Sequence, residues 1–320
     1  MSGLVSTIIP VFNRPDLVRS AVQSVLQQTY RPIEILLVDD GSTDDTPGVL
    51  AALQRESPEE VRVLRQSNAG PGAARERGRL AARGAYIQYL DSDDWLLPNK
   101  FADQVAALEA SPDCSIAYGT ARLVAADGTV LAEPSRRTAE LHRHLFPLLL
   151  QERWWHTHTP LFRRSISDAA GPWPHFRPED WDLEARMGAL GARLVHCGST
   201  VSCQREHELG ERVSRGPQAA YLRDEARFLP RLFACALMAG VPVQAPQWDH
   251  LARWCLLRSR QLHALGAQAE GDQVLALSRQ VACGLPDGSA VVWRQRCYQL
   301  LCGSVGTGLA SRWSALLRPI

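Results

Sequence analysis

The chain has 320 residues and a formal net charge of +1, from 35 basic and 34 acidic side chains. Such a balance argues against a strongly basic nucleic-acid binder, and an apolar fraction of 45% excludes an intrinsically disordered chain. The length exceeds what one hydrophobic core usually supports, so we expect a main domain with a smaller appendage.

Strand and helix patterns alternate in the first third of the chain. Short apolar runs suited to buried strands cover residues 5–12, 33–38, 61–64 and 85–90. Helical patterns lie between them: one from Pro15 behind an Asn13 N-cap, one over residues 46–55 and one over residues 72–83. This alternation with short turns predicts a mostly parallel sheet with helices on both faces.

The middle of the chain mixes both patterns. The expected elements are a hairpin around Asp127-Gly128, a helix over residues 138–151, a helix over residues 179–190 and a strand over residues 194–203. From about residue 216 the pattern is helical. The sequence therefore predicts an α/β region followed by a helical one.

An acidic turn, Asp91-Ser92-Asp93-Asp94, follows the fourth predicted strand. In an extended segment residues i and i+2 point the same way, so Asp91 and Asp93 can converge. Two carboxylates at a strand end offer the oxygen ligands that Mg²⁺ or Mn²⁺ prefers. The alternative is a solvated acidic turn in front of a helix.

Two further loops should meet the acidic turn, because ligands bind at the carboxyl ends of parallel strands. In Asp39-Asp40-Gly41-Ser42, an Asp can accept from a base N–H or a ribose hydroxyl, or the segment can cap a helix. Gly70-Pro71-Gly72 precedes Arg75 at a predicted helix start, which suits anion binding. Neither G-x-G-x-x-G after the first strand nor a Walker-type motif occurs, which argues against those nucleotide sites.

Four blocks together resemble the family-2 glycosyltransferases of the GT-A fold. They are residues 6–13, 39–44, 68–75 and 91–94, in order and at the family's spacing. The resemblance covers roughly residues 1–110, and a weaker match at Glu179-Asp180-Trp181-Asp182-Leu183 extends it to about residue 215. It implies a GT-A catalytic domain over 1–215, with a nucleotide-binding half (1–110) and an acceptor half (111–215), and a helical C-terminal region over 216–320.

The resemblance implies an inverting transfer of a sugar from a nucleoside-diphosphate sugar, with a UDP-sugar favoured. The acceptor would be a glycan or a lipid-linked molecule in bacterial surface polysaccharide synthesis, and Mg²⁺ or Mn²⁺ would assist. The implied donor-binding residues are Pro10, Phe12, Asn13, Asp39, Asp40, Gly41, Asn68, Arg75, Asp91 and Ser92. The implied metal ligands are Asp93, as the principal one, Asp91 and His207. Glu76 departs from the family pattern, which usually has Asn there.

Inversion by single displacement needs a base on the acceptor side. The resemblance places it at Asp180, with Glu179 as the second candidate, and a helix N-terminus should lower the pKa of that carboxyl. The alternative is ordinary negative charge at a helix start. Likewise His207, in Gln204-Arg205-Glu206-His207, is either a metal or diphosphate contact or part of a polar loop.

An aromatic run over residues 154–158 also has two interpretations. Trp154 and Trp155, beside His156 and His158, could pack on the C–H faces of an acceptor sugar. A buried hydrophobic segment is the alternative, because Trp buries a large apolar area.

The last third of the chain is basic. Residues 216–320 carry 11 basic and 6 acidic groups, and no acid follows Asp287 although four Arg do. Arg interleaved with Trp and Leu at helical spacing can lie in a membrane interface, so one interpretation is peripheral membrane contact. The other is a helix packed on the catalytic domain with Arg outward.

The eight cysteines form no C-x-x-C pair, and the sequence has neither a secretory signal nor an 18-residue apolar run. We therefore expect a cytoplasmic protein with reduced thiols, at the inner face of the membrane where the tail binds it. Two other functions stay open: a non-catalytic nucleotide-sugar-binding relative, and a nucleotidyltransferase.

Overall fold

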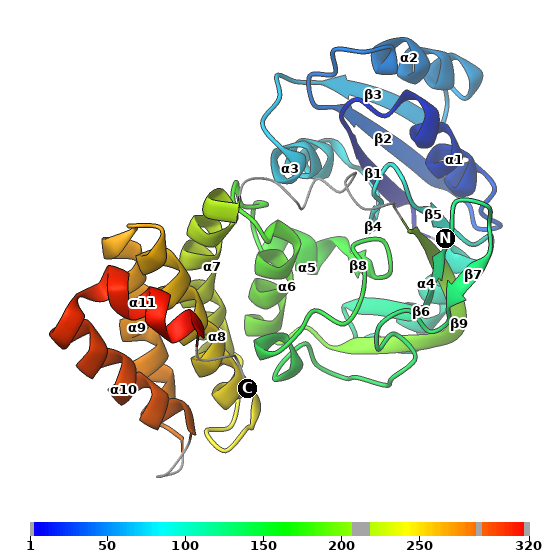
Figure 1. Ribbon diagram of the computed structural model, residues 1–320. Helices are drawn as coiled ribbons and strands as arrows, with labels where there is room; N and C mark the ends of the chain where they lie inside the picture. The colour runs from blue at the N-terminus through cyan, green and yellow to red at the C-terminus, as the bar shows by residue number, and fades with distance from the viewer. Residues whose placement is uncertain (1–2, 207–217, 286–289, 317–320) are drawn as a thin grey trace. The chain divides into compact units, whose positions relative to one another are not determined.

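The computed structural model describes residues 3–206, 218–285 and 290–316. The chain divides into two compact units (Figure 1). The first comprises Met1–Leu145, Arg153–His175 and Leu190–Glu211, and the second comprises Phe146–Glu152, Phe176–Ala189 and Arg212–Ile320. The segment that carries Glu179 and Asp180 thus groups with the C-terminal helices, and a boundary near residue 215 stays a prediction.

One sheet forms the centre of the first unit. Its strands are β1 (Val5–Val11), β2 (Ile33–Asp39), β3 (Val61–Arg65), β4 (Tyr86–Tyr89), β5 (Trp95–Leu96), β6 (Ile116–Val124), β7 (Val130–Ala132), β8 (Leu161–Arg163) and β9 (Leu194–Arg205). The helices of this unit are α1 (Pro15–Leu26), α2 (Thr46–Glu56), α3 (Pro71–Ala81), α4 (Lys100–Ala110) and α5 (Arg164–Ala169). The strand order is β3-β2-β1-β4-β8-β6-β9-β5, with β7 beside β6.

The sheet is largely parallel, as the strand–helix alternation predicts. β3, β2, β1 and β4 run parallel to one another, and so do β6 and β9. β8 is antiparallel to both its neighbours, and β6 pairs with β7 as the predicted hairpin. Because β1, β2 and β4 are parallel, the loops after them lie on one edge of the sheet.

Helices cover both faces of this sheet. Val5, Ile9 and Val11 of β1 belong to one buried cluster with the apolar stripe of α1 and with α4 residues such as Phe101. On the other face, Gly78 of α3 lies so close to Ile8 that a Cβ there would be 2.4 Å from an Ile8 methyl. Alternate residues of β1 therefore pack against different helices, which is the expected pattern for a central strand.

Two local predictions are wrong. Residues 138–151 form no α-helix. The carbonyls of Glu140 and His142 accept from the Tyr118 hydroxyl, and His144 forms an isolated β-bridge with Arg193, so these backbone groups have partners outside the segment. Pro147 would also interrupt a helix. Asn13 does not cap α1, because Arg14 occupies that position and makes no side-chain cap.

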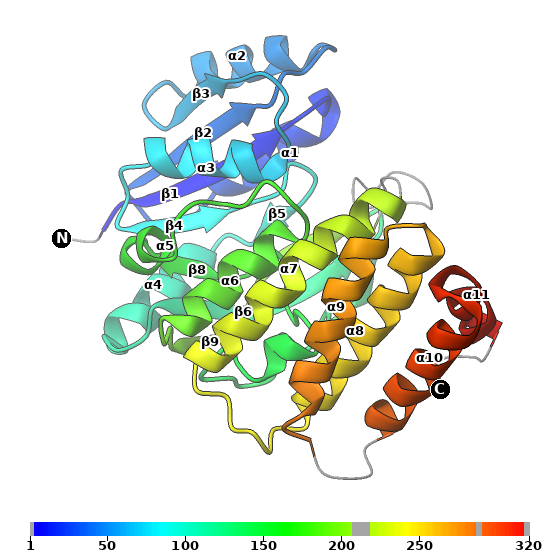
Figure 2. The ribbon, with the colours of Figure 1, turned by 90° about the vertical axis from the view of Figure 1, so that its left-hand side faces the viewer.

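The second unit is helical, as expected for the C-terminal region. It contains the 3₁₀ turn η1 (Leu148–Leu150), α6 (Glu179–Ala189), α7 (Gln218–Met238), α8 (Gln247–Ala264), α9 (Gln268–Ala282), α10 (Ala290–Val305) and α11 (Thr307–Leu316). α7, α8 and α9 lie side by side (Figure 2). Within the described ranges, none of the helices combines the length and the apolar character needed to cross a bilayer.

Candidate functional site

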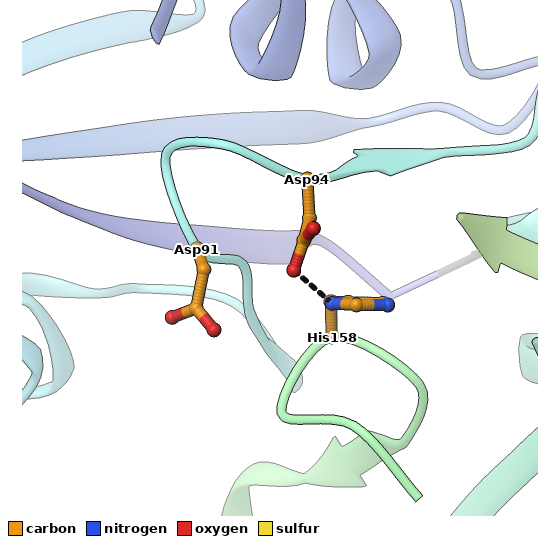
Figure 3. Close-up of side chains that lie close together, drawn as sticks. All are labelled: Asp91, Asp94 and His158. Carbon is orange, nitrogen blue, oxygen red and sulfur yellow. Dashed lines mark ion pairs between the residues drawn. The ribbon is translucent and has the colours of Figure 1, made fainter. Parts of the chain in front are cut away.

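The acidic turn lies directly after β4. Its backbone closes tightly, with the Asp94 N–H donating to the Asp91 carbonyl at 3.2 Å. Asp91, Asp94 and His158 each offer one ligand atom, and these atoms lie within 4.8 Å of one another (Figure 3). Two carboxylates and an imidazole at this spacing match the donors that Mn²⁺ accepts. The residues present therefore fit a divalent cation.

Asp94 fastens the turn to the end of β9 and to the loop before β8. One carboxylate oxygen accepts from the backbone N–H of Arg205, at the end of β9, at 2.8 Å. The other lies 2.8 Å from Nδ1 of His158, and both side chains are buried. The Arg205 guanidinium also donates to the Asp93 carbonyl at 3.2 Å and lies over the Trp95 ring. The backbone at Asp93 is thus held by contacts of its own carbonyl and of the next residue, Asp94.

A buried polar layer supports the loop that carries His158. The Thr159 carbonyl accepts from Lys100 Nζ at 2.8 Å and from Gln104 Nε2 at 2.9 Å, and the His158 carbonyl accepts from Gln88 at 3.0 Å. Lys100 is the single lysine of the chain, and burial lowers its pKa to about 7. Lys100 Nζ also donates to Gln104 Oε1 at 2.6 Å, so this buried amine has two acceptors and the layer holds the loop in place.

Arg75 lies beneath the acidic turn. Its Nη2 contacts Asp91 Oδ1 at 2.7 Å, and its guanidinium lies 4.9 Å from the centre of the Trp173 ring. Arg75 is 5% exposed, whereas the Asp91 side chain is 32% exposed. Asp91 therefore presents its carboxylate to solvent while a buried cation holds it in place.

The loop after β2 is tied to the loop before α3. Asp40 accepts from the backbone N–H of Ala69 at 2.9 Å and of Gly70 at 2.8 Å, so both its oxygens are used within the protein. Gly41 has φ of 77°, and a Cβ there would lie 2.7 Å from the Asn68 nitrogen. Only glycine allows this approach. Asp40, Gly41 and Asn68 are therefore brought together, while their part in donor binding stays a prediction.

Asp39 is 1% exposed at the end of β2. Its Oδ1 accepts from the Ser42 N–H at 2.9 Å, and its Oδ2 lies 3.3 Å from Arg65 Nε. A cavity of about 400 Å³ beside α2 and β3 has both Asp39 and Arg65 in its wall. A buried carboxylate and an exposed guanidinium at one cavity are suited to a polar planar ligand.

The loop after β1 contacts the same region. Pro10 pairs in register with Val38 of β2, and Phe12 is 44% exposed. Asn13 adopts φ of 51°, and its Oδ1 accepts from the Thr43 N–H at 2.9 Å. This crossing to the β2 loop explains why Asn13 is unavailable as a helix cap.

The predicted base lies in the second unit. Glu179 and Asp180 are in the first turn of α6, and the Trp181 N–H donates to Asp180 Oδ1 at 2.8 Å. His207 falls outside the described residues. Trp154 and Trp155 are both 0% exposed, so the aromatic run is a buried segment and not an acceptor surface.

Sequence reasoning missed two contacts of the acidic turn. It treated His158 only as part of an aromatic run and left Asp94 without a role, although the two side chains pair. It also left Trp173 unassigned, although that ring covers Arg75. Both pairings join residues far apart in the chain, and no local pattern marks them.

Proteins with similar sequences include ones named as glycosyltransferases. An uncharacterized glycosyltransferase of Nostoc sp. is 33% identical over 197 residues, covering 60% of this chain and 58% of that protein. The glycosyltransferase GlyG of Streptococcus pneumoniae is 42% identical over 100 residues, covering 31% of this chain and 33% of GlyG. The chain thus spans less than two thirds of the length of these relatives.

Solved structures share the GT-A fold. S. aureus TarS in complex with UDP-GlcNAc has a TM-score of 0.65 at 18% identity, covering 88% of this chain and 81% of that one. The mannosyltransferase PcManGT of Pyrobaculum calidifontis, in complex with GDP-Man and Mn²⁺, has a TM-score of 0.56 at 17% identity, covering 99% and 88%. The family model for glycosyl transferase family 2 matches residues 6–166. Together with the largely parallel sheet and the loops gathered at its edge, this match establishes that the chain belongs to glycosyl transferase family 2.

Proposed function

We propose that the protein is an inverting, metal-dependent glycosyltransferase that moves a sugar from a nucleoside-diphosphate sugar, with a UDP-sugar favoured, to a glycan or lipid-linked acceptor in bacterial surface polysaccharide synthesis. One observation carries the proposal: the acidic turn, with Asp91 held by Arg75, lies on the same sheet edge as the loops of Asp39 and Asn13. TarS with UDP-GlcNAc and PcManGT with GDP-Man support a nucleotide-sugar donor.

The nucleoside would bind among the loops after β1 and β2. Asp39 accepts from a base N–H or a ribose hydroxyl at the cavity it lines, and Phe12 offers an exposed apolar ring. The loops are shaped by contacts to backbone groups that involve Pro10, Asn13, Asp40, Gly41 and Asn68. Arg75 and Ser92 face the diphosphate end, where a cation and a helix start attract negative charge.

The divalent cation, Mg²⁺ or Mn²⁺, would be held by Asp93 and Asp91. His207 and His158 are the two candidates for a nitrogen ligand. Imidazole in the donor set favours Mn²⁺ over Mg²⁺. When bound, such an ion offsets the negative charge that grows on the departing diphosphate. Arg75 adds a fixed positive charge next to the same turn.

The transfer is a single displacement. The oxygen of the acceptor hydroxyl forms a bond to the anomeric carbon, and the bond from that carbon to the diphosphate oxygen breaks on the opposite face. The nucleoside diphosphate leaves with the electron pair. Asp180 takes the hydroxyl proton. Glu179 is the second candidate for this role.

Donor binding is the direct test of the proposal. We expect one nucleoside-diphosphate sugar, with Mn²⁺, to raise the melting temperature by several degrees, as binding at about 100 times Kd adds about 2.7 kcal/mol of stability. The measurement is a thermal-shift screen of UDP-, GDP- and dTDP-sugars with Mn²⁺ or EDTA. The donor found is then assayed with acceptor extracts. Release of the nucleoside diphosphate supports transfer, whereas release of pyrophosphate from a nucleoside triphosphate identifies a nucleotidyltransferase.

We also propose that α10 makes peripheral contact with a membrane at the inner face. Trp293 is 68% and Leu300 is 72% exposed, and Arg296 between them is also exposed. Their spacing of three and four residues puts all three on one side of α10. Val291 and Tyr298 are buried, so the helix packs through its other side. An exposed Trp–Arg–Leu side suits an anionic lipid surface.

The double substitution Trp293→Glu with Leu300→Glu is therefore expected to abolish co-sedimentation with phosphatidylglycerol vesicles. It removes two apolar anchors and adds negative charge, at a cost of about 1 kcal/mol for each charge near the surface. Phosphatidylcholine vesicles are the control for charge. Equal binding by the double variant, or by a chain truncated at residue 290, would remove the proposal.

A further inference from the structure

One side of α7 faces the start of α6. Tyr221, Asp224, Phe228 and Arg231 recur at intervals of three, four and three residues, so they form a single stripe along α7. Each member of this α7 stripe contacts the segment from Phe176 to Asp182. The α7 stripe therefore packs against the segment that contains Glu179 and Asp180.

Arg177, just before α6, contacts two residues of the α7 stripe. The Arg177 guanidinium lies 5.6 Å from the Tyr221 ring centre, and its Nε is 3.5 Å from Asp224 Oδ2. Both side chains of the Arg177–Asp224 pair are less than one third exposed. The chain is thus attached to α7 two residues before α6 begins.

Trp181, directly after Asp180, is held on three sides. Its ring lies 5.6 Å from Phe228 and 5.3 Å from Trp254 of α8. Its indole Nε1–H donates to the Leu149 carbonyl in η1 at 3.0 Å. A ring that is both packed and hydrogen-bonded has one orientation, and so does the backbone next to it.

Asp182 supplies a third tie. It is 1% exposed, and two guanidinium groups share its carboxylate. Arg231 Nε contacts Oδ1 at 2.5 Å and its Nη2 contacts Oδ2 at 3.1 Å, while Arg186 Nε lies 2.9 Å from Oδ2. Arg186 belongs to α6 itself, so it is the Arg231 contact that connects this buried charge to α7. Such two-pronged contacts fix direction as well as distance.

We infer that α7 is a positioning element for catalysis: the stripe, and Arg231 above all, holds the first turn of α6 so that the Asp180 carboxylate keeps the place that proton removal requires. This rests on the proposed role of Asp180 as base. It gives the first helix of the C-terminal region a part in the reaction. Ordinary helix packing would stabilise the unit without acting through Asp180.

The experiment measures kcat and donor KM for Arg231→Met in the full-length chain. We expect kcat to fall about tenfold or more, because a displacement of about 1 Å at a reacting group can cost 10²-fold. Donor KM and Mn²⁺ affinity should not change. Arg231→Lys should recover part of the loss, since Lys keeps the charge but not the fork. Arg223→Met is the matched control, because it removes an α7 arginine whose partner is Glu270 and not α6.

A double-mutant cycle separates positioning from structural damage. In an Asp180→Asn background, Arg231→Met should lower the residual rate less than about twofold, because the group it positions has gone. The same loss in both backgrounds, or an unchanged kcat for Arg231→Met, would overturn the inference alone. Full activity of Asp180→Asn would overturn the base assignment and the inference with it.

Discussion

Replacing Asp180 by Asn is expected to lower kcat for sugar transfer about 10²- to 10⁴-fold, the usual contribution of a general base. Asn has the same shape as Asp but cannot take the proton of the acceptor hydroxyl. Binding of donor and Mn²⁺ should be unchanged, because the residues proposed for them lie outside α6. Transfer is measured by steady-state kinetics, and donor binding is measured separately by calorimetry.

Glu179→Gln is the informative companion to Asp180→Asn, because Glu179 precedes Asp180 in the same first turn of α6. We expect a loss of less than about tenfold for it, since it removes one helix-start charge and such charges contribute about 0.3–1 kcal/mol. A reversed order of the two losses would move the base to Glu179. Equal and small losses would leave family 2 membership intact but refute a base in this turn.

The fold of the first 110 residues was predictable because its signals are local. Each strand is a short apolar run, and each polar loop follows a strand end, so parallel order alone places Asp39 and Asp91 on one edge. Asp40 and Gly41 also follow a strand end, so their loop lies at the same edge. The helix predicted over residues 138–151 does not form, because the backbone there pairs with Tyr118 and Arg193, which lie far from it in the chain.

The details of the candidate site were less accessible. The pairing of Asp94 with His158 depends on how β4, β8 and β9 meet, and the sequence carries no periodic trace of it. The sequence allowed Trp154 and Trp155 to be exposed or buried. They are buried because residues distant in the chain, such as Tyr118 of β6, pack against them. The α7 stripe has a helical period, but its partner segment could not be identified from that period.

Asp93→Ala is expected to weaken Mn²⁺ binding at least tenfold and to lower transfer about 10²- to 10³-fold. Removing a residue that only orients a metal ligand already costs about 10- to 100-fold in affinity, and losing charge stabilisation at a leaving group costs about 10²–10³ in kcat. Free Mn²⁺ is measured by electron paramagnetic resonance during titration of the protein. Asp113→Ala is the control, because it removes a half-exposed carboxylate of the same unit that pairs with Arg193 and has no proposed part in metal binding.

His158→Ala and Asp94→Asn decide how the acidic turn uses its carboxylates. If Asp94 and His158 fasten the turn, both variants should lower the melting temperature. His158→Ala leaves a buried carboxylate oxygen of Asp94 without its partner, at about 1–3 kcal/mol, and Asp94→Asn removes the charge from the contact. Their effect on Mn²⁺ affinity should then be smaller than that of Asp93→Ala. If they instead weaken Mn²⁺ binding more than Asp93→Ala does, the ion lies among Asp91, Asp94 and His158, whose ligand atoms are within 4.8 Å of one another. The principal ligand would then be a residue that only the folded chain, and not its sequence motif, identifies.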